Sequence, residues 1–569
     1  MRLQALLAVV CLGFILSLLT VQVQSANLCL APVPAVGGSL TEGVVGRPQF
    51  INPLLADANQ IDQELVNLVF DGLTRYDAQG QLAPALARAW QVSEDGLTVT
   101  FTLRENAVWH DGTPVTSADV AFTYGLLQGE MPAEAGVIAP PPGLVRLWQA
   151  VTITVVDATT ISFTLPAPYS PFLEATTRGI LPAHLLPNVT MATLAAADFN
   201  QSPVGTGPFM VESGDWTRTG RLRLRPNPVY WRGGVSLDAV EYRFYADMPA
   251  AIAAYEAGEI YAINHVSARE LPRVAALPGM RLFSAPEKRF TQLIFNLTNS
   301  SLSAMRELEV RQALAYGLDR HRLVDVAVNG QGVLFEGPYL PSSWAYNEQA
   351  MTVYATNPIS ATALLDGSGW VWSEGAPQRE REGEALLLRL LYPDTPTDTA
   401  LAAEIARQWA ALGVGVTLLP TPLADLAAAL AQRAYDVALV EITPLGDPDL
   451  YDFWSQEAII RGRNYGGWNQ RRASEALEEA RQLWPVEERR VRYERFLFYY
   501  DNEMPALTLY QHVYTYGLSQ AVNQLGGSGL ADIGLIHEPR DRYRTLADWF
   551  LVYRDVLVAC PEPTSAPLP

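Results

Sequence analysis

Patterns typical of strands alternate with patterns typical of helices along most of this chain. Residues 97–103 alternate apolar and polar side chains with the period of two that a half-buried strand needs. Residues 151–156 and 160–165 do the same on either side of Asp157 and Ala158, which predicts a β-hairpin. Apolar residues recur at helical spacing over residues 305–318, 397–412 and 473–500. This alternation favours α/β bodies built on mixed sheets.

The length of 569 residues exceeds what one hydrophobic core normally serves, so two or three lobes are expected. An apolar share of 49% and a charged share of 18% are those of an ordinary globular protein. The formal net charge of −20 argues against a nucleic-acid partner, whose phosphates need a basic surface. It argues equally against attachment to an anionic membrane through a polybasic patch.

The N-terminus has the pattern of an export signal. Arg2 supplies a positive charge, residues 3–19 are almost wholly apolar, and the small residues Ser25 and Ala26 form a cleavage region. An uncleaved anchor is the alternative, because the apolar run approaches the ~20 residues that cross a bilayer. We expect residues 1–26 to be a signal peptide or an anchor, and the rest of the chain to work outside the cytoplasm.

Cysteine usage fits an exported protein. Cys11 lies within the signal, which leaves Cys29 and Cys560 in the mature chain. In an oxidising compartment these two thiols can form a disulfide that joins the two ends of the chain, and two separate thiols are the alternative. Lipidation of Cys29 is disfavoured, because Leu28 stands where such a signal has a small residue.

The sequence lacks the motifs that ATPases and hydrolases need. A phosphate-binding loop ends in Lys followed by Ser or Thr, whereas Lys288, the chain's only lysine, precedes Arg289. The nucleophile elbow Gly-x-Ser-x-Gly does not occur. No two of the six histidines stand four residues apart, the spacing of a zinc site on one helix. We therefore expect no catalytic residue, no metal site and no cofactor, and a protein that is not an enzyme.

Longer motifs follow one another in a fixed order between residues 40 and 525. They are residues 52–55 (Asn-Pro-Leu-Leu), 69–73 (Val-Phe-Asp-Gly-Leu), 108–116 (Val-Trp-His-Asp-Gly-Thr-Pro-Val-Thr), 205–209 (Gly-Thr-Gly-Pro-Phe), 225–231 (Arg-Pro-Asn-Pro-Val-Tyr-Trp), 310–320 (Val-Arg-Gln-Ala-Leu-Ala-Tyr-Gly-Leu-Asp-Arg), 447–449 (Asp-Pro-Asp) and 503–510 (Glu-Met-Pro-Ala-Leu-Thr-Leu-Tyr). Together they resemble solute-binding protein family 5, the oligopeptide- and dipeptide-binding components of ABC importers. We interpret most of them as scaffold, with Arg311 paired to an acidic side chain.

The resemblance implies an α/β fold that is bilobal, periplasmic-binding-protein-like and of type II, with an extra subdomain on the first lobe. The chain would cross between the lobes twice, and hinge motion would close the cleft around a ligand. The expected divisions are a linker over 27–46, lobe I over 47–57, 198–287 and 503–560, its subdomain over 58–197, lobe II over 288–502, and a disordered, proline-rich tail over 561–569.

The resemblance also implies where ligand contacts lie. In peptide-binding relatives a Trp-x-x-Asp segment precedes the Asp-Pro of the second lobe, and its aspartate meets the α-amine of the peptide. Those two positions are Glu441 and Pro444 here, so the amine-binding aspartate is missing, and Glu441 is either its replacement or a plain strand-edge residue. The other candidates are Arg47, Gln49 and Phe50 on lobe I, His265 at a cleft tyrosine position of the relatives, Thr443 and Asp447 on lobe II, and the aromatic residues Trp454, Tyr465 and Trp468, each of which fits a core position equally well.

The implied role is capture of a peptide or peptide-like solute, in the periplasm or at the outer face of the cell membrane. A monomer without a cofactor would deliver this solute to the permease subunits of an ABC importer. An oligosaccharide or a metal chelate is the alternative ligand, which Pro444 favours. A ligand sensor without coupling to transport is the alternative role, and the missing catalytic motifs disfavour a secreted hydrolase.

Overall fold

The computed structural model describes residues 28–520 except 78–80, 133–138, 213–215, 299–302 and 445, together with residue 546 and residues 552–559. The expected signal or anchor over 1–26, Cys560 and the expected tail over 561–569 lie outside the described residues. Within the described part, no helix combines the length and the apolar character needed to cross a membrane.

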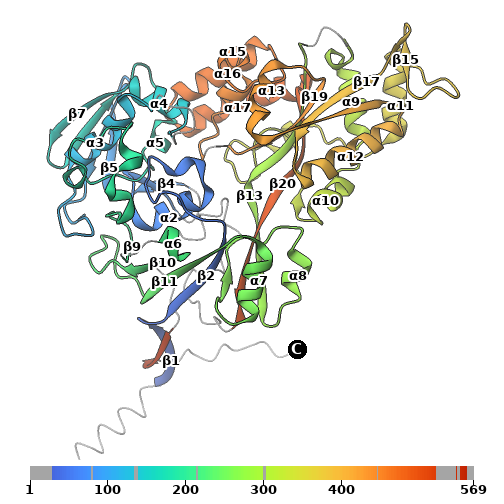
Figure 1. Cartoon of the computed structure of the whole chain (residues 1–569). Helices are drawn as coiled ribbons and strands as arrows, with labels where there is room; N and C mark the ends of the chain where they lie inside the picture. Colours follow the sequence, from blue (N-terminus) through green and yellow to red (C-terminus); the bar gives the residue numbers. More distant parts are fainter. Residues whose placement is uncertain are drawn as a thin grey trace, which may run out of the picture.

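An eleven-stranded mixed sheet runs through the molecule (Figure 1). In spatial order its strands are β18 (Gly415–Thr421), β17 (Leu387–Pro393), β19 (Val437–Ile442), β13 (Met280–Phe295), β20 (Ala506–Ser519), β12 (Ala262–Ile263), β2 (Ser39–Val45), β11 (Ala239–Tyr245), β10 (Arg221–Pro226) and β9 (Phe209–Val211), with β14 (Gly332–Val333) attached to β20. The two longest strands, β13 and β20, pair antiparallel and stand at its centre.

These two strands pass between two bodies that have separate hydrophobic cores (Figure 1). The first body contains β2 and β9–β12, and its main core includes Leu40 on β2, Ala285 on β13 and Leu518 on β20. The second body contains β17–β19, and the residues of its two adjoining cores come from the sequence range 290–510. The prediction of a bilobal α/β fold is confirmed, whereas the residue boundaries predicted for the lobes and the subdomain stay a prediction.

A four-stranded antiparallel sheet forms an additional unit of the first body (Figure 1). Its order is β5 (Ala87–Val92), β6 (Thr98–Leu103), β8 (Thr160–Thr164) and β7 (Thr152–Asp157), so the predicted strand and hairpin are confirmed. Tyr124 and Trp148 stack with ring centroids 3.8 Å apart, and both rings meet Phe163 of β8 edge to face. The other elements of this body are α2 (Gln60–Val69), β3 (Thr74–Tyr76), β4 (Leu82–Pro84), α3 (Ser117–Gln128), α4 (Pro142–Gln149), α5 (Phe172–Ala175), α6 (Trp216–Thr219), α7 (Met248–Glu256) and α8 (Leu271–Ala275).

Helices surround the sheet of the second body. They are α9 (Leu308–Tyr316), α10 (Arg320–Val328), α11 (Pro358–Gly367), α12 (Pro396–Ala410), α13 (Leu423–Gln432), α14 (Tyr451–Trp454), α15 (Ala458–Arg461), α16 (Arg471–Gln482) and α17 (Val486–Glu503), with the short strands β15 (Glu380–Arg381) and β16 (Glu384–Ala385). The helical pattern over 473–500 is therefore two helices, because Pro485 cannot continue the first one.

Arg311 on α9 bonds to backbone carbonyls and not, as expected, to an acidic side chain. Its guanidinium donates to the carbonyl oxygens of Met305, Glu503 and Met504, at distances of 2.6, 2.5 and 3.0 Å. Two of these bonds occupy carbonyl groups at the end of α17 that have no partner within the helix. The role of Arg311 is thus structural.

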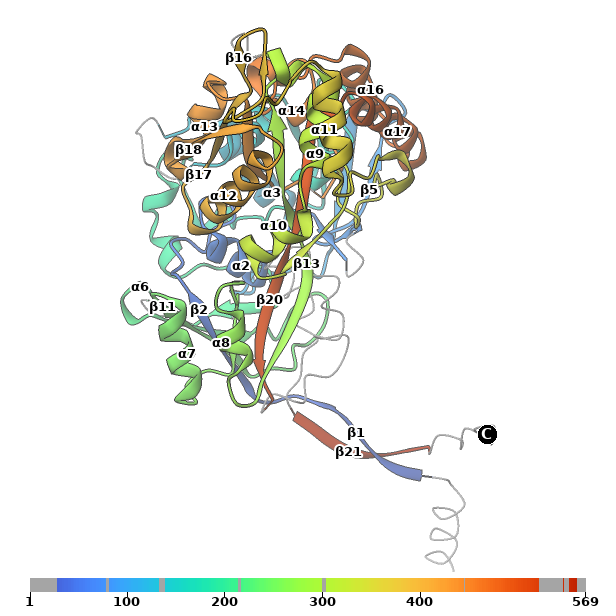
Figure 2. The ribbon, with the colours of Figure 1, turned by 90° about the vertical axis from the view of Figure 1, so that its right-hand side faces the viewer.

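The linker predicted over residues 27–46 is wrong. Strand β2 is hydrogen-bonded between β11 and β12, and Leu40 and Val44 on it are buried. Before it, β1 (Leu28–Ala35) pairs antiparallel with β21 (Val552–Ala559), and Figure 2 shows this ribbon projecting from the first body. Proline and glycine made both strands hard to predict from the sequence. Proline is tolerated in β1 because this strand belongs to a two-stranded ribbon with a free edge.

Candidate functional site

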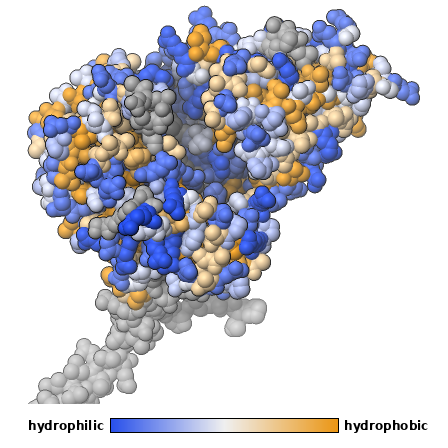
Figure 3. Space-filling view, viewed as in Figure 1, coloured by the Kyte–Doolittle hydropathy of each residue, from blue (hydrophilic) through white to orange (hydrophobic). Residues whose placement is uncertain are grey.

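The surface is hollowed between the two bodies (Figure 3). Strands β13 and β20 connect the bodies at this level, and their pairing is irregular there. Pro286 faces Val513, but Phe290 faces Gln511, so β13 has two more residues than β20 in this interval. Such an irregularity bends a strand and re-aims its side chains. Residues 287–289 therefore lie at the junction of the two bodies.

A charged cluster occupies this junction. Arg289 donates to the carboxylate of Glu287 at 2.8 Å and to that of Glu441, on β19, at 2.9 Å. Burial opposes the charge of Arg289, yet the two carboxylates raise its pKa above the ordinary value. Glu287 is buried, whereas the Glu441 side chain keeps 44% of its surface exposed. Glu441 is thus the acidic group of the cluster that a solute can reach.

His512 on β20 completes the cluster. Its Nε2 lies 2.8 Å from the hydroxyl of Thr291 and 3.6 Å from the carboxylate of Glu441. Burial, followed by the positive charge of Arg289 and the proximity of His265, lowers the pKa of His512 to about 3. The imidazole is therefore neutral at physiological pH, and its contact with Glu441 is not an ion pair.

Two of the residues predicted from the sequence, Glu441 and His265, come together around this cluster. His265 follows β12, its ring lies 5.5 Å from that of Tyr514 on β20, and its proximity is one of the causes that lower the pKa of His512. Thr443 is exposed just beyond the end of β19, two residues after Glu441. Three elements that are distant in sequence thus contribute to one polar surface.

The predicted contacts of the first lobe lie on the segment after β2. Arg47 and Gln49 are exposed, and Phe50 is half-buried against the first core. The carboxylate of Asp62 on α2 accepts the backbone N–H groups of Gln49 and Phe50, at 2.7 and 2.9 Å. Burial raises the pKa of Asp62 to about 7, although these two bonds lower it. Asp62 therefore fixes the backbone of this segment.

Three predicted site residues have structural surroundings instead. Trp454 and Trp468 are 2% and 1% exposed within the core of the second body, where their rings meet edge to face. The carboxylate of Asp447 is held by two bonds from Arg489, at 2.6 and 2.7 Å. None of the three offers a free surface to a solute. Tyr465 is half-buried against the same core, and its carbonyl oxygen accepts bonds from Arg433 and Tyr435.

Glu287, Arg289 and His512 were not among the residues predicted from the sequence. The available signal was the run Glu287-Lys288-Arg289, three charged residues inside an otherwise mostly apolar stretch of strand. His512 likewise interrupts the apolar pattern of β20. A charged or polar side chain inside a mostly apolar strand is uncommon unless it has a partner or serves a site, so both interruptions pointed to this junction.

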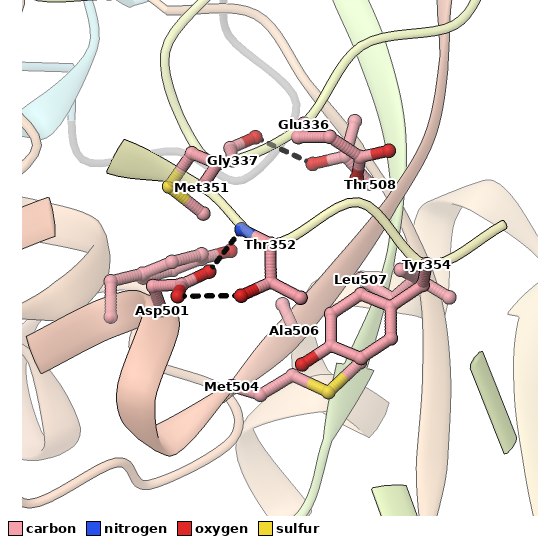
Figure 4. Close-up of a pocket in the computed structure, with 11 residues that line it drawn as sticks. Glu336, Gly337, Met351, Thr352, Tyr354, Asp501, Met504, Ala506, Leu507 and Thr508 are labelled. Atoms are coloured by element: carbon pink, nitrogen blue, oxygen red, sulfur yellow. Dashed lines mark hydrogen bonds between the residues drawn. The ribbon is translucent and has the colours of Figure 1, made fainter. Parts of the chain in front are cut away.

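A small cavity of about 20 Å³ lies inside the second body at the end of α17 (Figure 4). Asp501 borders it and accepts the backbone N–H and the hydroxyl of Thr352, at 2.7 and 2.8 Å. Met351, Met504 and Tyr354 line it as well. A cavity of this volume holds about one water molecule and is far smaller than the ~300–1,000 Å³ typical of ligand pockets, so it does not compete with the junction as a solute site.

The cluster of Glu287, Arg289, Glu441 and His512 acts through charge and hydrogen bonding. Its exposed carboxylate can accept bonds from a cationic or hydroxylated solute, while half-buried Arg289, itself paired with buried Glu287, holds that carboxylate in place. The described residues contain no group of three or more His, Cys, Asp or Glu side chains able to hold a metal ion.

Comparison with known proteins places this architecture among binding proteins. Residues 81–458 match the family described as bacterial extracellular solute-binding proteins, family 5 Middle. The oligopeptide-binding protein AppA of Bacillus subtilis is 24% identical over 83% of this chain and 88% of its own length. The nickel-binding periplasmic protein of Escherichia coli is 26% identical over 65% of this chain and 68% of its own length.

Solved structures share the fold. The substrate-binding protein CtaP of an ABC transporter from Listeria monocytogenes superposes with a TM-score of 0.74 at 24% identity, over 91% of this chain and 99% of that one. AppA from Bacillus subtilis in complex with a nonapeptide gives a TM-score of 0.68 at 22% identity, over 91% and 100% of the two chains. Because the family match spans more than half of its residues, this chain belongs to family 5 of the bacterial extracellular solute-binding proteins.

Proposed function

We propose that this protein captures a peptide or a peptide-like solute outside the cytoplasm and delivers it to the permease of an ABC importer. The observation that carries the proposal is the charged cluster where β13 and β20 join the two bodies. A solute held there contacts both bodies at once. Such a solute binds the closed form better than the open form, which is the condition for it to drive hinge closure.

The charges of the cluster favour a cationic group of the solute. Glu287 and Glu441 contribute two carboxylates, and Arg289 offers one guanidinium, while His512 is neutral. Together these groups carry a net charge of one negative unit, and Glu441 is the carboxylate that a solute can reach. Glu441 would therefore bind the α-amine of a peptide in place of the missing aspartate, with Thr443 beside it.

We also propose where the protein acts and in what form. Export through the N-terminal segment, a monomeric state and action without catalysis or a cofactor are expected of a binding component. Identification of the molecules that co-purify with the protein, described next, distinguishes this proposal from its alternatives. These are an oligosaccharide or a metal chelate as the ligand, and a sensor as the role.

The first test is native mass spectrometry of the purified protein, followed by denaturation and identification of released molecules. A ladder of short peptides supports peptide capture and gives its length range. A single sugar or metal chelate changes the solute but keeps the role in capture. An empty protein that binds no member of peptide, sugar or chelate libraries contradicts the proposal and favours a sensor.

The second test is the variant Glu441→Gln, compared with Glu348→Gln as an exposed control on the same body. If Glu441 binds the α-amine, the variant should bind a co-purified peptide at least tenfold more weakly, because a charge-assisted bond is lost. N-acetylation of the same peptide should weaken binding to the wild type by a similar factor. Equal affinity of both variants would exclude this role.

A further inference from the structure

A second contact joins the two bodies away from β13 and β20. The carboxylate of Glu174, on α5 of the first body, accepts the backbone N–H groups of Gly446 and Asp447 in the second body, at 2.5 and 2.7 Å. Residues 446–449 lie between β19 and α14 and contain the Asp-Pro-Asp motif. Figure 1 shows α5 on the side of the first body that faces α16 and α17.

The 446–449 turn, which contacts Glu174, is held in place by residues of the second body. Asp447 is paired with Arg489 of α17, and Asp449 with Arg481 of α16, at 2.6 and 2.7 Å. Both aspartates are nearly buried, so these pairs are shielded from solvent. The two N–H groups are thus fixed in place before Glu174 meets them, which lowers the entropy cost of the contact.

Neighbouring contacts surround the Glu174 bonds. The backbone N–H of Ser170 donates to the carbonyl of Arg481 at 2.8 Å, and the indole N–H of Trp484 donates to the carbonyl of Gly96 at 3.3 Å. Gly446 also packs against Tyr76, and a Cβ at this glycine would overlap with the phenol oxygen. All of these contacts cross from one body to the other without passing through the connecting strands.

We propose that Glu174 is a positioning residue for closure: its carboxylate fixes the 446–449 turn against the first body when the cleft is closed. Opening separates α5 from this turn and breaks both bonds. The turn begins three residues after Thr443 and five after Glu441, so Glu174 couples closure to the position of the residues that border the solute. This inference rests on the proposed hinge closure.

The test is hydrogen exchange of the full-length protein purified with its solute, the state in which the cleft is closed. In Glu174→Gln the amides of Gly446, Asp447 and Ser170 should exchange at least tenfold faster than in the wild type, because the contact opens more often. Glu105→Gln, an exposed carboxylate on the first body, should change none of them. Amides within β6 should keep their wild-type rates in both variants.

A second variant changes the same contact at a residue of the second body. Gly446→Ala places a methyl group against Tyr76, so the amide of Ser170 should again exchange faster, and the double variant with Tyr76→Ala should restore slow exchange. Exchange within twofold of the wild type in Glu174→Gln, or no rescue in the double variant, overturns the proposal. Native mass spectrometry of each variant shows whether it retains the same solute as the wild type, which separates loss of this contact from loss of capture.

Discussion

Asp62 shows how one buried carboxyl can hold a segment of the site. It accepts two backbone N–H groups of the Gln49–Phe50 segment, and burial raises its pKa to about 7. An aspartate in the unfolded chain has a pKa of about 3.9. The folded protein therefore keeps this proton to a higher pH than the unfolded chain does, and the stability that the carboxyl contributes falls as pH rises between about 4 and 7.

This difference predicts the effect of Asp62→Asn. Between about pH 5 and pH 8, the free energy of unfolding of the wild type should fall by roughly 2–3 kcal/mol relative to that of the variant. Urea unfolding at several pH values measures this difference, and Asp425→Asn, at an exposed position, serves as control. A difference between wild type and Asp62→Asn that does not change with pH would contradict the raised pKa.

The candidate site could be predicted residue by residue only in part. The family motifs place Glu441 and His265 next to the cleft, and both lie at the charged cluster, while their contact with a solute stays a prediction. For Trp454 and Trp468 the sequence left a core position and a cleft wall equally open, and their packing places both in the core. Arg289 was missed since its partner Glu441 is 152 residues away in the sequence.

At the scale of elements, the Asp-Pro-Asp turn depends on α16 and α17. Arg489 on α17 is 5% exposed and holds Asp447, whose pKa burial raises to about 6 in spite of this partner. Arg489→Met should destabilise the protein by about 3–5 kcal/mol, since it leaves a buried carboxylate without this partner. The double variant with Asp447→Asn should recover most of this loss.

Chemical denaturation midpoints of the two variants and the wild type measure the effect. Arg472→Met, at an exposed position of α16, is the control and should remain within about 0.5 kcal/mol of the wild type. If Arg489→Met is no less stable than this control, the pair does not hold the turn.

Single elements were predicted best where their periodicity was complete. The strand at Thr98–Leu103 alternates over its whole length, and α12 begins and ends within two residues of its predicted range. The long pattern before Tyr500 was read as one helix because the periodicity of α16 and α17 continues across Pro485. Strand β2 was missed since its neighbours in the sheet, β11 and β12, come some 200 residues later.

For the whole molecule, the motifs gave the two-lobed fold, but the ribbon of β1 and β21 could not be foreseen. Its strands lie more than 500 residues apart, and no local pattern reports such a pairing. The register places Leu28 opposite Ala559 and Cys29 opposite Val558. The pairing thus brings the two ends of the described chain together beside the first body (Figure 2).

This ribbon bears on the predicted disulfide between Cys29 and Cys560. Cys560 lies outside the described residues, but it directly follows Ala559 in the sequence. We expect the two thiols to be oxidised in the exported protein, so that its intact mass rises by about 2 Da on reduction, as for any single disulfide. Cys29→Ser should abolish this change. The melting temperature of the Cys29→Ser variant should also be lower than that of the wild type, because the variant lacks the cross-link that restricts the unfolded chain. Two free thiols that react with an alkylating agent before reduction would show that the ribbon is held by backbone pairing alone.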